Sequence, residues 1–387
     1  MSGPLSGLKV VDVSIMAAGP WIGALLGQLG AEVIKIEPPA GDGTRWVEPK
    51  QNGMGTNFIC LNLNKKDIIL DFKKNEDRDI ALKLIAGADI FIQNLRVGVI
   101  DRLGLGYEAV NQVNPKIIYC SVSGFGEKGT MAKEACADFI MQAYSGFANT
   151  NGHEGESLEA FRFTGFIDLT TSIVAIESIL AALIHRQKTA LGQKVEVSML
   201  QASLEMQYTQ VSNMLNTRSL PRPLGSSSQG LSPDGAFKTL DAEIFVTVFN
   251  EEEWSFFCDA LEIPELKSDI RFSNNIKRVE NRKSLNALVN EIVARRPSVW
   301  WLRVLERKGV ACAIAQSFEQ IKYHSQVQAN EMIKEVKTEK WGNVYVGGMP
   351  WHFARTPGEI TPPPVPGGDT QMVLDQLKLN QYSRDLN

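Results

Sequence analysis

Hydrophobic positions in the first 125 residues follow two periods, and these periods alternate along the chain. Short apolar runs predict strands at residues 8–14, 31–37, 68–72, 89–94 and 116–122. Between them, PWIGALLGQLG (20–30) and DRDIALKLIAGA (77–88) predict helices, with Pro20 suited to a first turn and Gly30 to a C-terminal cap. Alternation of this kind predicts an α/β fold with a mostly parallel sheet in a Rossmann-like layout. The GxGxxG fingerprint is absent from the first turn, which argues against a nicotinamide dehydrogenase.

The middle of the chain contains its most apolar helical pattern. Apolar residues at three- and four-residue spacing predict a helix from about Thr170 to Arg186 with one buried face: Ile173, Ile176, Leu180, Leu183 and Ile184. Its apolar part is interrupted by Glu177 and is too short to span a bilayer, so we expect no membrane segment. Residues 219–235, SLPRPLGSSSQGLSPDG, predict a linker, and FKTLDAEIFVTVF (237–249) then alternates like a pair of strands in a smaller α+β domain.

Composition narrows the class of partner. The 387 residues are 44% hydrophobic and 22% charged, with a formal net charge of −4, so no basic field attracts nucleic acid or acidic lipid. The N-terminus has no signal pattern, and we expect a cytoplasmic protein with small-molecule partners. The five cysteines form no CxxC pair and the four histidines show no ligand spacing, which disfavours a metal site, a disulfide framework and a local catalytic triad.

Asp168, just before the apolar helix, has two interpretations. As an N-cap it would contribute about 1 kcal/mol, and the pattern alone favours this role. Thr170, Thr171 and Ser172 are rival caps. If one of them caps the helix, Asp168 lies in the preceding turn beside Gly165, where a small residue lets a substrate approach the carboxylate.

Two short basic clusters follow predicted strands. Lys65, Lys66 and Lys73 form the first, and Arg96 and Arg102 form the second. A solvated surface is the default interpretation. The alternative is a phosphate-bearing ligand, because ligands of open α/β sheets lie at the carboxyl ends of the strands.

Several motifs, taken in order over nearly the whole chain, resemble the class III CoA-transferase family, which includes formyl-CoA and crotonobetainyl-CoA transferases and related racemases. They are GLKVVDVSIMAAGPWIGALLGQLGAEVIKIEPPAGDGTR, LNLNKKDIILDFK, FIQNLRVGVIDRLGLGY, NPKIIYCSVSGFGEKG, ADFIMQAYSG, and TGFIDLTTS leading to AALIHRQKTALGQKVEVSML. The resemblance implies an enzyme that moves CoA from an acyl-CoA donor, such as succinyl-CoA, to a small carboxylic or dicarboxylic acid. It implies acyl-CoA as a substrate and no permanently bound cofactor.

Asp168 matches the catalytic aspartate of the family, which reverses the preference for a cap. The resemblance implies a carboxylate nucleophile that passes through an aspartyl anhydride and an aspartyl-CoA thioester, so that no ATP is required. The alternatives are an α-methylacyl-CoA racemase and a CoA-binding module without turnover. Racemases of the family carry a histidine immediately before the aspartate that matches Asp138, and Ala137 stands there in this chain, which favours transfer over racemisation.

The resemblance also implies where CoA binds. The matching positions are Ala17 and Ala18, then Leu70, Asp71, Phe72 and Lys73, then Asn94 and Leu95, and finally Arg102, which we expect to bind phosphate. Pro38 stands where the formyl-CoA enzyme has an arginine, and Arg45 is a candidate replacement. The first loop carries Ala17 instead of that enzyme's glutamine, and GSSSQG (225–230) replaces its run of glycines, so these positions do not support oxalate as the acceptor.

The family architecture implies an interlocked homodimer in which a small domain is inserted into the large one. We therefore expect residues 1–218 in the large CoA-binding domain, 219–235 as linker, 236–328 as the small domain, and 329–387 returning to the large domain. The chain ends in QYSRDLN, shorter than the usual final helix. Arg162 and His153 are candidates to recognise a second carboxylate on the acceptor, and a surface role is at least as plausible for both.

Overall fold

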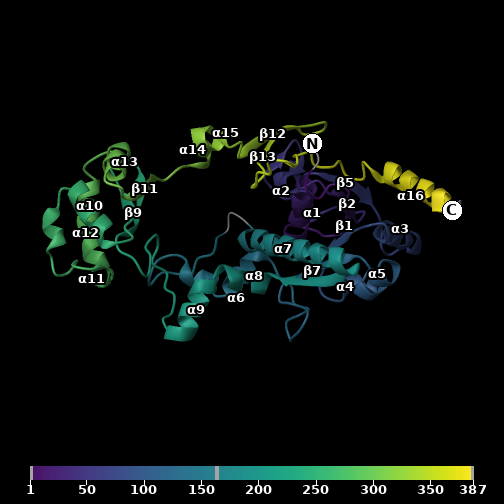
Figure 1. Ribbon diagram of the computed structural model, residues 1–387, viewed down its shortest axis with the longest axis horizontal. Coiled ribbons are helices and arrows are strands. Elements are labelled where there is room, and N and C mark those ends of the chain that lie inside the picture. Colours follow the sequence, from purple (N-terminus) through teal and green to yellow (C-terminus); the bar gives the residue numbers. More distant parts are fainter. Residues whose placement is uncertain (1–2, 162–164, 385–387) are drawn as a thin grey trace. The chain divides into compact units, whose positions relative to one another are not determined.

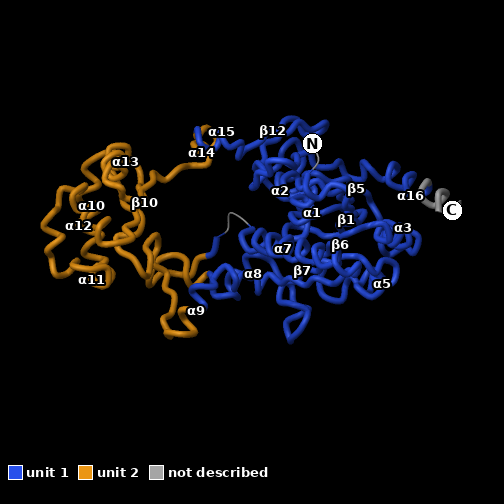
Figure 2. The backbone as a smooth tube through the Cα atoms, viewed as in Figure 1, with its two compact units in different colours: residues 1–147, 160–211, 325–387 blue, residues 148–159, 212–324 orange. Residues whose placement is uncertain are grey.

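The computed structural model of the chain describes residues 3–161 and 165–384 and divides into two compact units. The first comprises residues 1–147, 160–211 and 325–387, and the second comprises 148–159 and 212–324 (Figure 2). Arg162 lies outside the described residues.

A six-stranded parallel sheet forms the centre of the first unit (Figure 1). Its order is β5-β2-β1-β6-β7-β8, and the strands are β1 Lys9–Asp12, β2 Glu32–Glu37, β5 Lys65–Ile69, β6 Ile90–Gln93, β7 Ile118–Ser123 and β8 Gln193–Ser198. Numbered by their place in the chain, these strands run 3-2-1-4-5-6, the order of a doubly wound α/β sheet. The predicted α/β class with a parallel sheet is confirmed.

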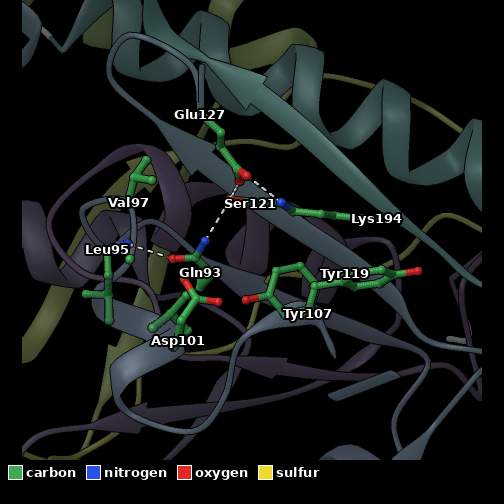
Figure 3. A pocket seen from close by; sticks show the side chains of 11 residues that line it. Gln93, Leu95, Val97, Asp101, Tyr107, Tyr119, Ser121, Glu127 and Lys194 are labelled. Atoms are coloured by element: carbon green, nitrogen blue, oxygen red, sulfur yellow. Dashed lines mark hydrogen bonds and ion pairs between the residues drawn. The ribbon is translucent and has the colours of Figure 1, made fainter. Parts of the chain in front are cut away.

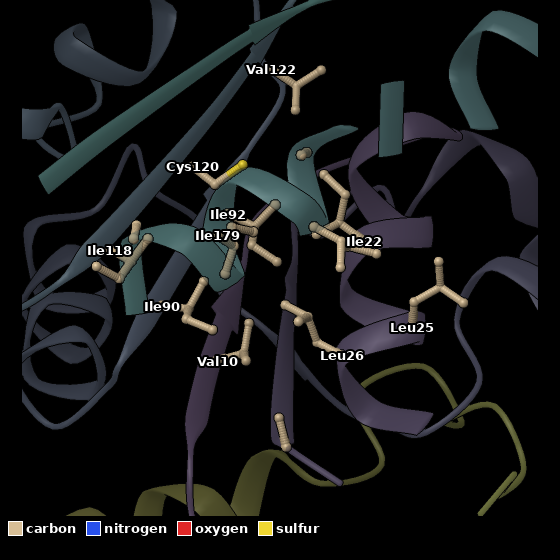
Figure 4. Close-up of a cluster of buried hydrophobic side chains, with 14 of the residues drawn as sticks. Val10, Ile22, Leu25, Leu26, Ile90, Ile92, Ile118, Cys120, Val122 and Ile179 are labelled. Carbon is tan, nitrogen blue, oxygen red and sulfur yellow. The ribbon is translucent and has the colours of Figure 1, made fainter. Parts of the chain in front are cut away.

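Helices cover both faces of this sheet. On one face, α1 (Ala18–Gln28) and α7 (Phe166–Thr189) pack in a core with Ile22, Leu26 and Ile179 (Figure 4). On the other face the core takes in residues of α3 (Asn75–Ala86), α4 (Val99–Arg102), α5 (Tyr107–Val113) and α16 (Thr370–Arg384). Burial of apolar side chains stabilises such layers by roughly 25 cal/mol per Å² removed from water. Apolar packing on both faces therefore holds the sheet and the positions of its strand ends.

The ends of helix α1 agree with the sequence. Pro20 lies in its first turn, and Gly30 follows its last residues with a φ of 99°, a conformation that favours glycine. Helix α7 is longer than predicted. By length and apolar composition it is the one described helix that passes the test for a membrane span, a test that core helices also pass. Five of its residues belong to the sheet-face core: Ala175, Ile176, Ile179, Ala182 and Leu183.

The remaining elements of the first unit are small. They are the paired strands β3 Lys50–Gln51 and β4 Met54–Gly55, the paired strands β12 Ile333–Thr338 and β13 Gly342–Gly347, and helices α2 Thr56–Leu61, α6 Asp138–Tyr144, α8 Met199–Met206 and α15 Ser325–Ala329. Helix α9 (Tyr208–Thr217) spans the boundary between the units. Residues on β12 and β13, including Val336 and Val344, share a core with Phe58 and Ile59 of α2, so residues after 325 belong to the first unit.

The second unit is an α+β body with its own core. Its antiparallel sheet, in the order β11-β10-β9, consists of β9 Asp234–Lys238, β10 Glu243–Thr247 and β11 Ala311–Ile314. Its helices are α10 Glu251–Ala260, α11 Asn275–Glu280, α12 Arg282–Val293, α13 Ser298–Arg307 and α14 Phe318–Tyr323. The predicted strand pair at 237–249 is confirmed as β9 and β10. His153 lies in this unit, with its ring against the main chain of Gly225.

Candidate active site

Asp168 is the third residue of helix α7. The helix begins at Phe166, four residues before the predicted start, and Gly165 is its N-cap. Both local interpretations of Asp168 are therefore wrong, because the residue neither caps the helix nor lies in the preceding turn. The prediction began at Thr170 and left out the first turn, although Ile167 in that turn is fully buried.

Asp138 caps helix α7 instead. It is the first residue of α6, and its Oδ2 accepts hydrogen bonds from the main-chain N–H groups of Ile167 (2.6 Å) and Asp168 (3.1 Å). These are two of the N–H groups that the first turn of a helix leaves without an intrahelical partner. The cap comes from a segment about thirty residues away, and it places the carboxylate of Asp138 close to that of Asp168.

The Asp168 carboxyl is half-buried, and burial together with the neighbouring Asp138 charge raises its pKa to about 7. No described group donates a hydrogen bond to its oxygens. A carboxylate with a raised pKa is more basic than an ordinary one, and therefore a better nucleophile once ionised. The arrangement suits attack on a thioester carbonyl at neutral pH.

Gln142 holds the cap in place. This fully buried side chain donates from Nε2 to Asp138 Oδ1 (2.5 Å) and to the carbonyl of Phe161 (2.9 Å), and its Oε1 accepts from the Phe161 N–H. Cys136 lies near the two carboxylates, and burial with these charges raises the pKa of its thiol to about 11, so the thiol stays protonated. Neither the role of Gln142 nor the capping role of Asp138 is indicated by the local sequence pattern.

The first turn of helix α1 adjoins the start of α7. Ala17 is the N-cap of α1. Its methyl side chain cannot accept a hydrogen bond, so it does not cap the first N–H groups of the helix. The buried hydroxyl of Ser172 lies 2.7 Å from the carbonyl of Ala18 and 2.9 Å from the carbonyl of Asp168. The main chain of Ala18, a predicted CoA-binding residue, is thus joined directly to the helix that carries Asp168.

The other predicted CoA contacts lie at the same, carboxyl edge of the sheet. Leu70, Asp71, Phe72 and Lys73 follow β5, Asn94 and Leu95 follow β6, and Arg102 ends α4. Lys73 and Arg102 are exposed, and Arg102 pairs with no carboxylate in the described part of the chain. Both cations are therefore available to a phosphate.

Two of the predicted cations are not available to CoA. Lys65 is wholly buried inside β5, where its Nζ contacts Asp12 Oδ2 (2.9 Å) and the carbonyl of Pro20 (2.7 Å), so it is neither solvated nor free to bind phosphate. Arg45 is buried and forms two hydrogen bonds with Glu37, from Nε (2.8 Å) and Nη2 (2.6 Å). Arg45 therefore cannot replace the family arginine missing at Pro38. Lys65 was misassigned because its partner Asp12 lies on another strand, and Arg45 because the turn after β2 folds it back onto Glu37, eight residues earlier.

A polar cavity of about 80 Å³ lies beside the loop that follows β6 (Figure 3). Gln93, Ser121, Glu127 and Lys194 line it as a chain of hydrogen bonds and an ion pair, and Tyr107 and Asp101 face it from the other side. Among the described residues no group of three or more His, Cys, Asp or Glu side chains is placed to hold a metal ion.

Comparison with known proteins identifies relatives over almost the full length. Residues 5–370 match the family model described as CoA-transferase family III. The chain is 32% identical to the succinyl-CoA:glutarate CoA-transferase of Mus musculus, over 97% of this chain and 86% of that protein. It is 33% identical to the acetyl-CoA:oxalate CoA-transferase of Acetobacter aceti, over 80% and 79%. A CAIB/BAIF family protein from Brucella suis shares the fold with a TM-score of 0.88 and 29% identity, over 97% of this chain and all of that one.

Proposed function

The chain belongs to CoA-transferase family III and is an enzyme of this class, and from this membership we propose that it transfers CoA from succinyl-CoA to a dicarboxylic acid with Asp168 as the nucleophile. The observation that carries the proposal is the first turn of α7. There, a carboxylate with a raised pKa lies at the carboxyl edge of the sheet, and the main chain of the same residue is linked through Ser172 to the predicted CoA-binding turn.

The first half of the proposed reaction transfers the acyl group and then CoA to the enzyme. An Asp168 oxygen attacks the thioester carbonyl of the donor, the C–S bond breaks, and CoA leaves as a thiolate while an aspartyl anhydride forms. The thiolate then attacks the aspartyl carbonyl of the anhydride, and the donor acid leaves as its carboxylate. The product is an aspartyl-CoA thioester at Asp168.

The second half runs the same steps in reverse order with the acceptor. The acceptor carboxylate attacks the aspartyl thioester and expels the CoA thiolate, which gives a new anhydride. The thiolate attacks the acceptor's acyl carbon, so the new acyl-CoA leaves and Asp168 is again a carboxylate. Thioester and anhydride have comparable reactivity, so the exchange between them needs no other energy source.

The racemase alternative is disfavoured at one position. The residue before Asp138 is Ala137, whose methyl side chain cannot accept a proton from the α-carbon of an acyl-CoA. Absence of solvent deuterium uptake at that carbon is the expected result. Rapid uptake without exchange would support racemisation instead.

Names of the relatives support a dicarboxylic acceptor, since glutarate and oxalate both occur among them. The test is a panel in which succinyl-CoA or acetyl-CoA is offered to the purified enzyme with monocarboxylic and dicarboxylic acids. New thioesters are identified by mass spectrometry. We expect the largest rate with succinyl-CoA and a dicarboxylic acid, and exchange confined to monocarboxylic acids would contradict the proposed acceptor class.

A further inference from the structure

The loop after β1 is held by the side chain of Asn94. The Ile15 N–H donates to Asn94 Oδ1 (2.8 Å), and Asn94 Nδ2 donates to the Ile15 carbonyl (2.7 Å). One amide therefore pairs with both polar groups of a single residue, as the main chain of a neighbouring strand would. This pairing uses a donor and an acceptor of Asn94.

Buried ionised side chains hold the residues on either side of Ile15. Lys35 Nζ donates to the Ser14 carbonyl (2.8 Å), and the Met16 N–H lies 3.2 and 3.3 Å from the two oxygens of Asp42. Lys35 and Asp42 are wholly buried and form an ion pair at 3.2 Å. Side chains from outside the loop thus bind main-chain groups of residues 14, 15 and 16 in turn, and the loop is fixed before any ligand arrives.

This loop packs tightly against the start of helix α1. A Cβ atom on Gly19 would lie 2.2 Å from Ser14 Cβ and 3.1 Å from Asn94 Cγ, so only glycine fits there. Ala17 lies between Met16 and this first turn. A displacement of Ile15 would therefore carry Ala17 and the first N–H groups of α1 with it.

The main chain next to Asn94 is held by the side chain of Gln93. Gln93 Oε1 accepts from the Leu95 N–H (2.9 Å), while Gln93 Nε2 donates to Ser121 Oγ (2.7 Å), which donates in turn to Glu127 (Figure 3). The peptide group after Asn94 is held in this way, which restrains the orientation of the Asn94 amide toward Ile15.

We propose that Asn94 is a positioning residue for CoA, acting through the loop at 14–16 and not through contact of its side chain with the ligand. The inference rests on the proposed function, which places CoA at Ala17 and Ala18. A site whose loops are already in the bound conformation loses less entropy on binding. Removal of the Asn94 amide therefore weakens CoA binding by releasing Ile15.

The test compares Asn94→Ala with a matched control, Asn114→Ala. Asn114 likewise bonds main-chain groups, donating to the carbonyls of Ile85 (2.9 Å) and Ala88 (2.7 Å), but it precedes β7 at the opposite edge of the sheet. Calorimetry with CoA, steady-state kinetics and hydrogen exchange of the free enzyme are measured for both. Asn94→Ala is expected to weaken CoA binding about tenfold, to raise KM by more than it lowers kcat, and to speed amide exchange in residues 14–17. Asn114→Ala is expected to change none of these three quantities.

Asn94→Asp is the second variant and covers the case in which the alanine variant does not fold. It keeps the acceptor that faces the Ile15 N–H and loses the donor, so an intermediate loss of CoA affinity is expected. Weaker CoA binding with unchanged exchange at 14–17 would mean direct contact and would overturn the inference. Unchanged CoA binding in Asn94→Ala would overturn it while leaving the proposed function intact. Failure of the wild-type enzyme to bind CoA would overturn both.

Discussion

Asp138 and Asp168 have different roles at the start of helix α7. The positive end of a helix dipole would ordinarily favour an ionised side chain in the first turn. Here Asp138 accepts the N–H groups of Ile167 and Asp168, and its charge acts against ionisation of Asp168. One carboxylate thus stabilises the helix, and the other keeps a pKa close to neutral.

The pH dependence of the reaction tests whether the charge of Asp138 controls the pKa of Asp168. Only ionised Asp168 attacks a thioester, so kcat/KM should rise with pH through about 7 and level off above it, because a raised pKa leaves the group protonated in acid. Asp138→Asn keeps an oxygen that can cap α7 and removes the charge. It should therefore move this rise to lower pH. An unchanged profile in Asp138→Asn would mean that the charge of Asp138 does not control Asp168.

At the residue scale, the sequence was least informative about long-range polar partners. Helical periodicity located Asp168 near a helix start, but the cap comes from Asp138, in another helix. Lys65 was assigned to solvent or ligand because nothing local indicates the buried Asp12, on another strand, that pairs with it. Contacts between strands depend on the register of the folded sheet, which local patterns do not encode.

At the scale of elements, Ser172 couples helices α1 and α7. Its hydroxyl lies within hydrogen-bonding distance of the main-chain carbonyls of Ala18 and Asp168, so it links the predicted CoA-binding turn to the main chain of the proposed nucleophile. We therefore expect CoA binding at the start of α1 to influence the position of Asp168 at the start of α7.

Ser172→Ala should lower the free energy of unfolding by about 1 kcal/mol, because the Ala18 carbonyl loses its buried partner. We expect kcat/KM to fall about fivefold, a loss of similar free energy at the transition state. Ser178→Ala is the control, because the Ser178 Oγ donates to the Val174 carbonyl one turn earlier in the same helix (2.8 Å) and joins no second described helix. Thermal unfolding and initial rates should distinguish the two variants, and equal effects would remove the coupling role from Ser172.

Element types were predicted well where apolar runs were long. The strands at 8–14, 31–37, 89–94 and 116–122 and both helices between the early strands are present. The strand expected at 68–72 runs instead from Lys65 to Ile69. Lys65 and Lys66 are typical of a surface, so the prediction left them out of the strand. Lys65 is nevertheless buried, because it pairs with Asp12.

At the scale of the molecule, apolar side chains remain exposed on the single chain. None of the ten residues of α9, all of them described, is buried, and Tyr208 and Leu215 are 66% and 69% exposed. Such surface supports the proposed homodimer, because a second copy would cover it. Light scattering should give twice the mass of the chain at micromolar concentration, and the mass of one chain would contradict the dimer.

Trapping the intermediate shows whether Asp168 carries the acyl group and then CoA. The enzyme is mixed with succinyl-CoA, quenched with hydroxylamine, digested and analysed by peptide mass spectrometry. We predict a hydroxamate at Asp168 in the wild type and in Asp138→Asn, and neither trapping nor exchange in folded Asp168→Ala. Trapping at another residue, or exchange that persists in Asp168→Ala, would show that Asp168 is not the nucleophile.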